Sequence, residues 1–217
     1  MNPYSDLAAV AHSIAEEGGS FPLALVDISN FDKNLKAMAE IALAHGKSLR
    51  LATKSIRVPE LIKRVLLSGH PFKGLMCYSA AEAEFLTSAD GVGTLANDIL
   101  IAYPCFYKSE LDALKRLHQN SNLKLRVVVD CLAHLEALSE LVPSSERPIE
   151  VVFDIDASLN YFSGLIHIGV RRSGLRTPEQ VNTLLDEIAA KKLNIKVVGL
   201  MAYEAQTAGL QDKNPFK

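Results

Sequence analysis

The stretch Leu49-Arg50-Leu51-Ala52-Thr53-Lys54-Ser55 decides the fold class of this chain. It is a short apolar run that ends on a lysine flanked by two small hydroxyl residues, a pattern typical of a β-strand with a functional side chain at its C-terminal end. In (β/α)8 barrels the active site is built from residues at such strand ends. Lys54 is therefore the candidate reactive group. A solvated lysine at a strand edge is the alternative interpretation.

Apolar runs of this kind recur along the chain. The first five begin about 25 residues apart, and the full set starts near Leu49, Phe72, Asp98, Leu123, Ile149 and Ile195. Helix-like segments follow each run, and several carry helix-start signals at Pro59, Ser79, Ser109 and Thr177-Pro178. Runs 125–129 and 151–153 are nearly all apolar, as expected when helices cover a parallel sheet. The pattern predicts an α/β fold, either a doubly wound sheet or a (β/α)8 barrel.

The segments that precede Lys54 also have regular patterns. Residues 6–17 predict an amphipathic helix closed by Gly18-Gly19, and residues 21–28 predict a strand. A second helix, capped by Ser29 or Asn30 and stopped by Gly46, has apolar residues on one face at Leu35, Met38, Ala39, Ala42 and Leu43. The polar segment 211–217 contains no further strand pattern. Six β-α strands are therefore expected from Lys54 onward, whereas a closed barrel requires eight.

Composition restricts the function classes. The chain has 217 residues and a net charge of −2, which gives neither a basic surface for nucleic acid nor a polybasic strip for a membrane. A small-molecule partner is favoured. Cys77, Cys105 and Cys131 have no disulfide or structural-zinc spacing and are expected to be reduced. No signal sequence or membrane-spanning run is present, so we expect a single cytoplasmic domain.

The longest interruption of the β-α pattern is segment 157–177. It follows a predicted strand end and contains Tyr161, His167, Arg171, Arg172 and Arg176. Loops of this length are usually functional, and an arginine cluster favours an anionic ligand group. We therefore expect these arginines to reach a pocket shared with Lys54. A solvated basic loop is the alternative.

Several chemistries are excluded by missing motifs. The sequence has no phosphate-binding P-loop, no complete G-x-G-x-x-G fingerprint and no G-x-S-x-G nucleophile elbow. The six histidines are scattered and none is spaced as a metal ligand with a carboxylate, so no metal site is expected in these residues. The strand ends instead offer Lys54, the acids Asp154 and Asp156, the Arg171-Arg172 pair and Tyr203. A lysine, arginines and an aromatic face suggest pyridoxal phosphate, whose aldehyde forms a Schiff base with lysine.

These motifs resemble a known family. A strand with lysine, an Asp-containing strand, an arginine-glycine turn and a Gly-Leu-x-x-aromatic segment together resemble the N-terminal barrel of the alanine racemase-like, fold type III, pyridoxal-phosphate enzymes over residues 21–209. Within that superfamily the chain looks most like the D-threonine aldolase and amino-acid deaminase branch. The segments that carry this likeness are Thr53-Lys54-Ser55, Asp154-Ile155-Asp156, His167 to Leu175 and Gly199 to Gln206.

The resemblance implies specific roles. Lys54 would hold the cofactor as a Schiff base and act as the base at the substrate Cα. Arg172, with Arg171 as the fallback, matches the arginine near the phenolic oxygen of the cofactor, and Asp154 lies in the matching strand. Tyr203 stands where many relatives have a histidine stacked on the pyridine ring, and it can supply the same flat face. A buried core tyrosine is the alternative for Tyr203.

The departures from the family pattern are also informative. Ser55-Ile56-Arg57 follows the lysine where racemases have a tyrosine-containing segment, and segment 157–170 separates the Asp and Arg motifs. The resemblance places the phosphate cup, the partner of the pyridine nitrogen and a second β domain beyond these residues. We therefore expect residues 1–217 to be a partial barrel that exposes apolar edges and binds the cofactor poorly, with any metal site in the unrepresented half.

The resulting expectation is a pyridoxal-phosphate-dependent lyase of D-amino-acid metabolism, an aldolase or deaminase with an amino-acid substrate. Its parent is expected to be a homodimer. Two alternatives stay open. One is a small non-catalytic protein that binds pyridoxal phosphate and manages its supply, and the other is an inactive β-α fragment without cofactor.

Overall fold

The computed structural model describes residues 3–22, 24–69, 71–104, 106–161 and 166–208. The chain forms two compact units, Met1–Ile41 and Ala42–Lys217, and each is considered by itself. Cys105 and the polar segment 211–217 lie outside the described residues.

The first unit contains helix α1 (Pro3–Glu16) and most of helix α2 (Ile28–Ala44). Helix α1 confirms the helix predicted over 6–17. Helix α2 begins earlier than predicted, because the carboxylate of Asp27 accepts a hydrogen bond from the backbone N–H of Asn30 at 2.9 Å and so serves as the cap. The strand predicted over 21–28 is wrong. A strand needs a neighbour to share its backbone hydrogen bonds, and no described strand pairs with this segment.

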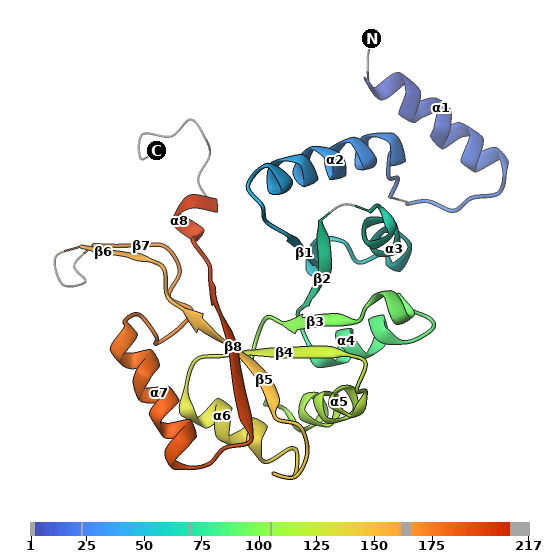
Figure 1. Ribbon diagram of the computed structural model, residues 1–217. Helices are drawn as coiled ribbons and strands as arrows, with labels where there is room; N and C mark the ends of the chain where they lie inside the picture. Colours follow the sequence, from blue (N-terminus) through green and yellow to red (C-terminus); the bar gives the residue numbers. More distant parts are fainter. Residues whose placement is uncertain (1–2, 23, 70, 105, 162–165, 209–217) are drawn as a thin grey trace. The chain divides into compact units, whose positions relative to one another are not determined.

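The second unit is built on a six-stranded parallel sheet (Figure 1). Its strands are β1 (Leu49–Ala52), β2 (Phe72–Cys77), β3 (Asp98–Ile101), β4 (Lys124–Val129), β5 (Ile149–Ile155) and β8 (Ile195–Ala202). They lie side by side in chain order, and every pair is parallel. A doubly wound sheet reverses its strand order at one point, so this sequential order excludes that alternative. All six predicted strands are confirmed, and no described residues pair β8 with β1.

Helices connect the strands and lie along one side of the sheet (Figure 1). They are α3 (Pro59–Leu67), α4 (Ala80–Thr87), α5 (Lys108–Gln119), α6 (Leu132–Ser139) and α7 (Pro178–Ala190), with a short α8 (Ala205–Ala208) after β8. Pro59 is at the first helical position of α3, as predicted. The Ser79 cap and the Thr177 capping box with Gln180 are also confirmed. Helix α5 begins at Lys108, so Ser109 is inside its first turn and is not its cap.

The main core lies between the helices and the sheet face that they cover. Alternate strand residues point into it, and fully buried examples are Leu75, Ile99, Ile101, Val127, Val129, Val151 and Phe153. The helices contribute Ile62, Ala83, Leu86, Leu114, Leu117, Leu135 and Leu138. Each large side chain buried in this way contributes roughly 1.5–3 kcal/mol of transfer free energy. The core therefore fixes which face of each strand is turned away from the helices.

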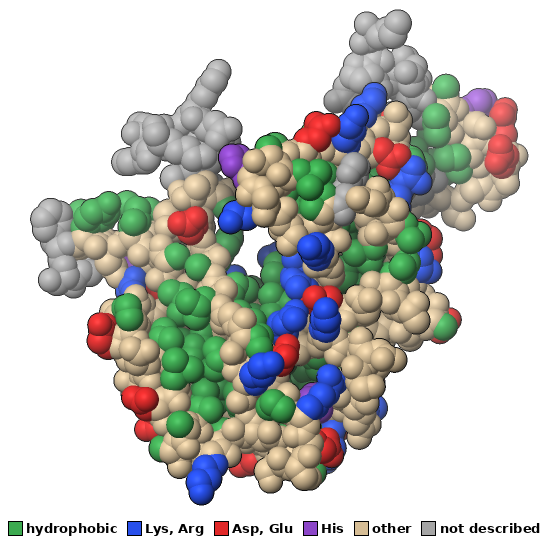
Figure 2. All heavy atoms as spheres, viewed as in Figure 1, with side chains coloured by type: hydrophobic (Ala, Val, Ile, Leu, Met, Phe, Trp, Pro, Cys, Tyr) green, Lys and Arg blue, Asp and Glu red, His purple; other side chains and the backbone are tan. Residues whose placement is uncertain are grey.

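On the opposite face a row of charged side chains crosses the sheet near the strand beginnings. Asp98 on β3 accepts contacts from Arg50 on β1 at 2.8 Å and from Arg126 on β4 at 2.9 Å. Arg126 also lies 3.3 Å from Glu150 on β5, which in turn lies 3.5 Å from Lys196 on β8. Figure 2 shows charged side chains of both signs close together over β3 and β4. Positive and negative side chains therefore alternate across the sheet, and their ion pairs favour one register between the strands that they join.

Strand β8 is more exposed than the other five strands of the parallel sheet. Its side chains alternate between intermediate and exposed, and Val198 and Leu200 have 37% and 66% of their surface exposed. The small hairpin β6 (Leu159–Tyr161) and β7 (Ile166–Ile168) exposes apolar residues as well. The apolar exposure predicted for an open sheet is thus present along this part of the second unit.

Candidate functional site

Lys54 lies just beyond the first strand. Strand β1 ends at Ala52, and a 3-10 turn formed by Thr53–Ser55 carries the lysine, so the strand ends two residues earlier than predicted. Thr53 is fully buried, and its hydroxyl donates a hydrogen bond to the carbonyl of Met76 on β2 at 3.1 Å. That bond fixes the turn on the neighbouring strand. Lys54 therefore projects from the carboxyl-terminal edge of the sheet.

Arg172 reaches the same edge from the loop that follows β5. Its Nε lies 3.5 Å from Oδ2 of Asp154, a buried carboxylate near the end of β5. Ser173 holds the loop in place, because its hydroxyl donates to the carbonyl of Asp154 at 2.6 Å. The guanidinium also lies over two aromatic rings, 4.9 Å from the centroid of Tyr103 and 5.4 Å from that of Tyr203. Cation-π contacts and the carboxylate together fix the arginine head.

Three tyrosines follow three different strands at this edge. Tyr203 comes directly after β8, where the sequence predicted an aromatic face, and it is 43% exposed, which excludes the buried core tyrosine. Tyr78 comes directly after β2, and Tyr103 lies two residues after β3. The rings of Tyr78 and Tyr103 contact each other with centroids 5.0 Å apart. Sequence reasoning missed these two, although their place directly behind predicted strands was a usable signal.

These groups line one cavity of about 150 Å³. Its walls are Ala52, Lys54, Met76, Cys77, Tyr78, Ala102, Tyr103, Arg172, Met201, Ala202 and Tyr203. Strands β1, β2, β3 and β8 thus supply an apolar floor, while Lys54 and Arg172 are its cationic groups. The structure brings together Lys54, Arg172 and Tyr203 as predicted from the sequence, with Asp154 behind the arginine.

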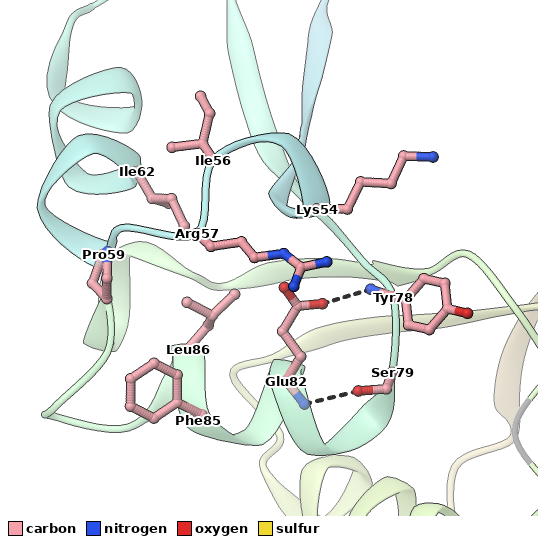
Figure 3. A pocket seen from close by; sticks show the side chains of 10 residues that line it. All are labelled: Lys54, Ile56, Arg57, Pro59, Ile62, Tyr78, Ser79, Glu82, Phe85 and Leu86. Carbon is pink, nitrogen blue, oxygen red and sulfur yellow. Dashed lines mark hydrogen bonds between the residues drawn. The ribbon is translucent and has the colours of Figure 1, made fainter. Parts of the chain in front are cut away.

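Lys54 also borders a second, larger cavity of about 350 Å³ (Figure 3). Apolar side chains of Ile62, Phe85 and Leu86 line its far side, and the Lys54 side chain extends away from them. Arg57 points toward the carboxylate of Glu82. Lys54 therefore stands between the two cavities.

Three backbone donors at the start of α4 are already used. Glu82 accepts a hydrogen bond from the N–H of Tyr78 at 2.7 Å, and Glu110 accepts one from the N–H of Ala80 at 2.6 Å. Ser79 accepts from the N–H of Glu82 at 3.1 Å. Carboxylates therefore occupy this helix terminus, which makes it a poor place for a second anion.

Asp154 and Asp156 are two residues apart but differ in electrostatic environment. Burial raises the pKa of Asp154 and the nearby Arg172 charge lowers it only in part, so the net direction is upward. Burial alone would also raise the pKa of Asp156. Hydrogen bonding by Ser158, whose N–H donates at 2.8 Å, and the charge of Arg176 outweigh it, so the pKa is lowered. Asp156 is thus the better stabilised anion.

The expectation that several arginines of segment 157–177 reach the lysine pocket is wrong in part. Arg172 lines the cavity, but Arg171 is exposed and is not among its lining residues. Arg176 is directed to Asp156 at 3.3 Å and to the hydroxyl of Ser158 at 2.6 Å. Adjacent residues in an extended loop point in different directions, so the sequence could not choose between Arg171 and Arg172.

The cysteines behave partly as expected. Cys77 is fully buried in the cavity wall, where burial and then the charge of Glu82 raise the pKa of its thiol to about 12. Cys131 is partly exposed and unpaired. It lies with Asp130 and His134 in a group whose ligand atoms are all within 4.8 Å of one another. The sequence-based expectation that no metal site is present stays a prediction, although the structure places His134 beside a carboxylate and a thiol.

Comparisons with known proteins show which family this chain resembles in sequence and fold. The family model described as the alanine racemase N-terminal domain matches residues 26–216. The D-threonine aldolase of an Arthrobacter species is 26% identical over 182 residues, which are 84% of this chain and 42% of that protein. The crystal structure of D-threonine aldolase from Filomicrobium marinum superposes with a TM-score of 0.66 at 24% identity, over 84% of this chain and 43% of that one.

Two further findings concern the length of the chain and its helices. The chain spans less than half the length of the two D-threonine aldolases to which it is similar. In the part of the chain that the structure describes, no helix is long and apolar enough to cross a bilayer.

Proposed function

The chain belongs to the alanine racemase N-terminal domain family, whose members are pyridoxal-phosphate enzymes built on a (β/α)8 barrel, and from this premise we propose that it serves a pyridoxal-phosphate-dependent lyase acting on a D-amino acid. The reaction would be a D-threonine aldolase type of cleavage or a deamination. The likeness to a D-threonine aldolase at 26% identity supports this choice of branch.

One observation carries the proposal. Lys54 and Arg172 are 118 positions apart in the sequence (172 − 54), yet they line the same cavity at the carboxyl edge of the sheet. That edge is where barrel enzymes place catalytic groups. A primary amine and a permanently charged guanidinium beside aromatic rings are the groups needed to hold an aldehyde-bearing, anionic, planar cofactor.

The residues present fit the aldehyde and ring of pyridoxal phosphate. Ala52, Ala102 and Ala202 leave a flat apolar floor, and Tyr203 offers a ring face. The cavities on the two sides of Lys54 measure about 150 and 350 Å³, and small-molecule sites usually occupy about 300–1,000 Å³. The start of α4 does not fit the phosphate, since Glu82 and Glu110 already occupy its donors.

When bound, the cofactor would supply an electrophilic aldehyde and a ring that withdraws electrons from the substrate Cα. Lys54 would hold the cofactor through Nζ, and its amine would take up or return a proton at the substrate Cα. Arg172 would donate hydrogen bonds to an anionic ring oxygen. Its position is set by Asp154 and by the rings of Tyr103 and Tyr203, so little side-chain freedom is lost on binding.

Reductive trapping tests the cofactor site. The purified chain is incubated with pyridoxal phosphate and reduced with borohydride, and the labelled lysines are identified by peptide mass spectrometry. We expect label on Lys54 at least about tenfold above that on other lysines, because among the lysines that the structure describes Lys54 alone lines the cavity with Arg172. Trapping detects even weak binding, which an open sheet leads us to expect.

Lys54→Ala should abolish the selective label, whereas the matched variant Lys124→Ala should not. Lys124 is an exposed lysine at the opposite, amino-terminal end of β4. Label spread evenly over surface lysines, or unchanged in Lys54→Ala, would refute the proposal.

Substrate screening then tests the reaction class. Incubation of the cofactor-loaded protein with D-threonine should give glycine and acetaldehyde for an aldolase, or 2-oxobutanoate and ammonia for a deaminase. Cofactor retained on Lys54 without turnover of D-threonine or D-serine would favour the non-catalytic binding protein instead.

A further inference from the structure

A compact group of three different ligand types stands at the junction between β4 and α6. Strand β4 ends at Val129, Asp130 and Cys131 follow, and His134 is in the first turn of α6. One ligand atom from each of the three residues lies within 4.8 Å of the other two. The whole group comes from five consecutive residues at a strand-to-helix turn, so its geometry depends on local backbone that the sheet and helix hold on both sides.

None of the three side chains has another evident structural task. Cys131 is the cap residue of α6 in extended conformation, but its side chain makes no capping hydrogen bond. Nδ1 of His134 is buried and lies 2.9 Å from Oδ1 of Asp130, yet it makes no hydrogen bond of acceptable geometry. The imidazole and the carboxylate are thus in contact with each other. The same two groups are close enough to share a metal ion with the thiol of Cys131.

The histidine ring is also held in orientation. Phe106 stacks on it with centroids 4.2 Å apart and an angle of 16° between the planes. A metal ligand whose ring is packed against an aromatic neighbour loses little rotational freedom on binding. The side chains of Asp130 and His134 are only 21% and 23% exposed, so the group is partly shielded from water.

From this geometry we propose that Asp130, Cys131 and His134 form a binding site for Zn²⁺. Thiolate, imidazole and carboxylate are the three side-chain ligands that zinc accepts, whereas calcium and magnesium select oxygen alone. With metal-ligand distances of about 2.0–2.3 Å, neighbouring ligands of a tetrahedral ion are roughly 3.3–3.5 Å apart. Closing the present group to that size requires side-chain movements of roughly 1 Å.

Three protein ligands leave a fourth position open. Closed structural zinc sites have four protein ligands, whereas catalytic or exchangeable sites keep one position for water or another oxygen ligand. The proposed site would also lie next to Asp154, the residue that holds Arg172 in the lysine cavity. Val129 is paired with Phe153, so the residues that follow them, Asp130 and Asp154, are neighbours. The zinc site does not depend on the proposed function and is tested without the cofactor.

Cobalt substitution gives the most direct test, since Co²⁺ takes the same ligands and reports on them spectroscopically. The full chain, stripped with a chelator and kept reduced, is titrated with Co²⁺. We expect saturation at one equivalent, visible bands of tetrahedral intensity and a near-ultraviolet thiolate-to-cobalt band. Added Zn²⁺ should displace the cobalt and abolish these bands.

Variants identify the ligands. Cys131→Ser should remove the thiolate band and weaken binding at least about 100-fold, and His134→Gln should weaken it similarly while the band persists at saturation. Cys77→Ala and Cys105→Ser are matched controls, because they remove the other two thiols and should change neither band nor affinity. Far-ultraviolet circular dichroism establishes that each variant is folded.

Three results would overturn the proposal. They are the absence of saturable Co²⁺ and Zn²⁺ binding by the reduced chain, a cobalt spectrum without a thiolate band, and a thiolate band that survives in Cys131→Ser. The first would leave Asp130 and His134 as a simple ion pair, and the last would assign the thiol ligand to Cys77 or Cys105.

Discussion

The two aspartates at the end of β5 predict opposite responses to the same substitution. Asp156 has a side chain only 2% exposed, a hydrogen bond from the N–H of Ser158 at 2.8 Å and Arg176 at 3.3 Å. Asp154 is also buried, but Arg172 lies at 3.5 Å and its Oδ1 has no hydrogen-bond partner among the described residues. Replacing each by Asn removes the charge and keeps the shape. The decrease in the free energy of unfolding should depend on how well neighbouring groups compensate each charge.

Asp156→Asn replaces charge-assisted contacts, which contribute about 1.5–3 kcal/mol, with neutral hydrogen bonds, which contribute about 0.5–1.5 kcal/mol. We therefore expect the free energy of unfolding at about pH 7 to fall by roughly 1–2 kcal/mol. For Asp154→Asn the lost ion pair is offset by relief of burying a poorly solvated carboxylate. The change should lie within about 1 kcal/mol of zero, and it can be stabilising.

The pH dependence sharpens the comparison. The lowered pKa of Asp156 means that its stabilisation is present above the unfolded value of about 3.9 and is lost as pH falls through the lower folded pKa. The raised pKa of Asp154 means that its contribution is complete below about pH 3.9 and is lost as pH rises through the higher folded pKa. The free energy of unfolding of Asp156→Asn should thus be closest to that of the parent chain in acid. That of Asp154→Asn should rise most, relative to the parent chain, at neutral pH.

Urea unfolding followed by far-ultraviolet circular dichroism measures both variants, since the sequence has no tryptophan for fluorescence. Curves at about pH 7 and about pH 2.5, on either side of the unfolded pKa of about 3.9, give the two differences and their pH dependence. If Asp154→Asn proves the more destabilising at neutral pH, or if the gap between the variants does not depend on pH, the assignment of the two environments is refuted.

Two further predictions concern the cavity wall and the charged row. The pKa of Cys77 is raised to about 12, so at about pH 8 its thiol should react with iodoacetamide about a thousandfold more slowly than a free thiol. Once the chain is unfolded in urea, Cys77 should react at the rate of a free thiol. A fast reaction in the folded chain would contradict the burial of Cys77. Arg126→Met should lower the free energy of unfolding by about 2 kcal/mol, because it bridges Asp98 and Glu150, although each acid keeps a second cation. The exposed Arg116→Met is its control in the same urea assay, and equal effects of the two would show that the row does not stabilise the sheet.

The sheet was predictable because its signal is local. Strands such as β4 and β5 contain nearly continuous apolar runs, and helix-start signals at Pro59, Ser79 and Thr177 separate them from the helices. The same reasoning failed for residues 21–28, which have a strand-like composition but no described partner strand. Composition reports that a segment could join a sheet, whereas pairing depends on what lies beside it.

The site was predictable only where one residue carries the chemistry. Lys54 and Tyr203 come directly after strands, Asp154 is near the end of β5 and Arg172 is in the loop that follows β5, and the sequential strand order brings these strand ends to one edge. Tyr78 and Tyr103 escaped notice because aromatic residues after strands are common. The group around His134 escaped for a different reason: its spacing matches no metal motif, and its side chains meet only because β4 turns directly into α6.

The charged row and the candidate site are physically coupled through register. Side chains alternate faces along a strand, so a slip of one residue between β4 and β5 would turn Asp154 toward the helices and move Arg172's anchor out of the cavity. The same slip would separate Arg126 from Glu150 and bury charge in the apolar core. The charged row thus raises the free energy of the shifted register, in which the site residues would no longer lie together. The described six-stranded sheet with its exposed β8 has fewer constraints than a closed barrel, so the charged row at the strand beginnings adds to the apolar core in keeping Lys54, Asp130 and Asp154 aligned at the strand ends.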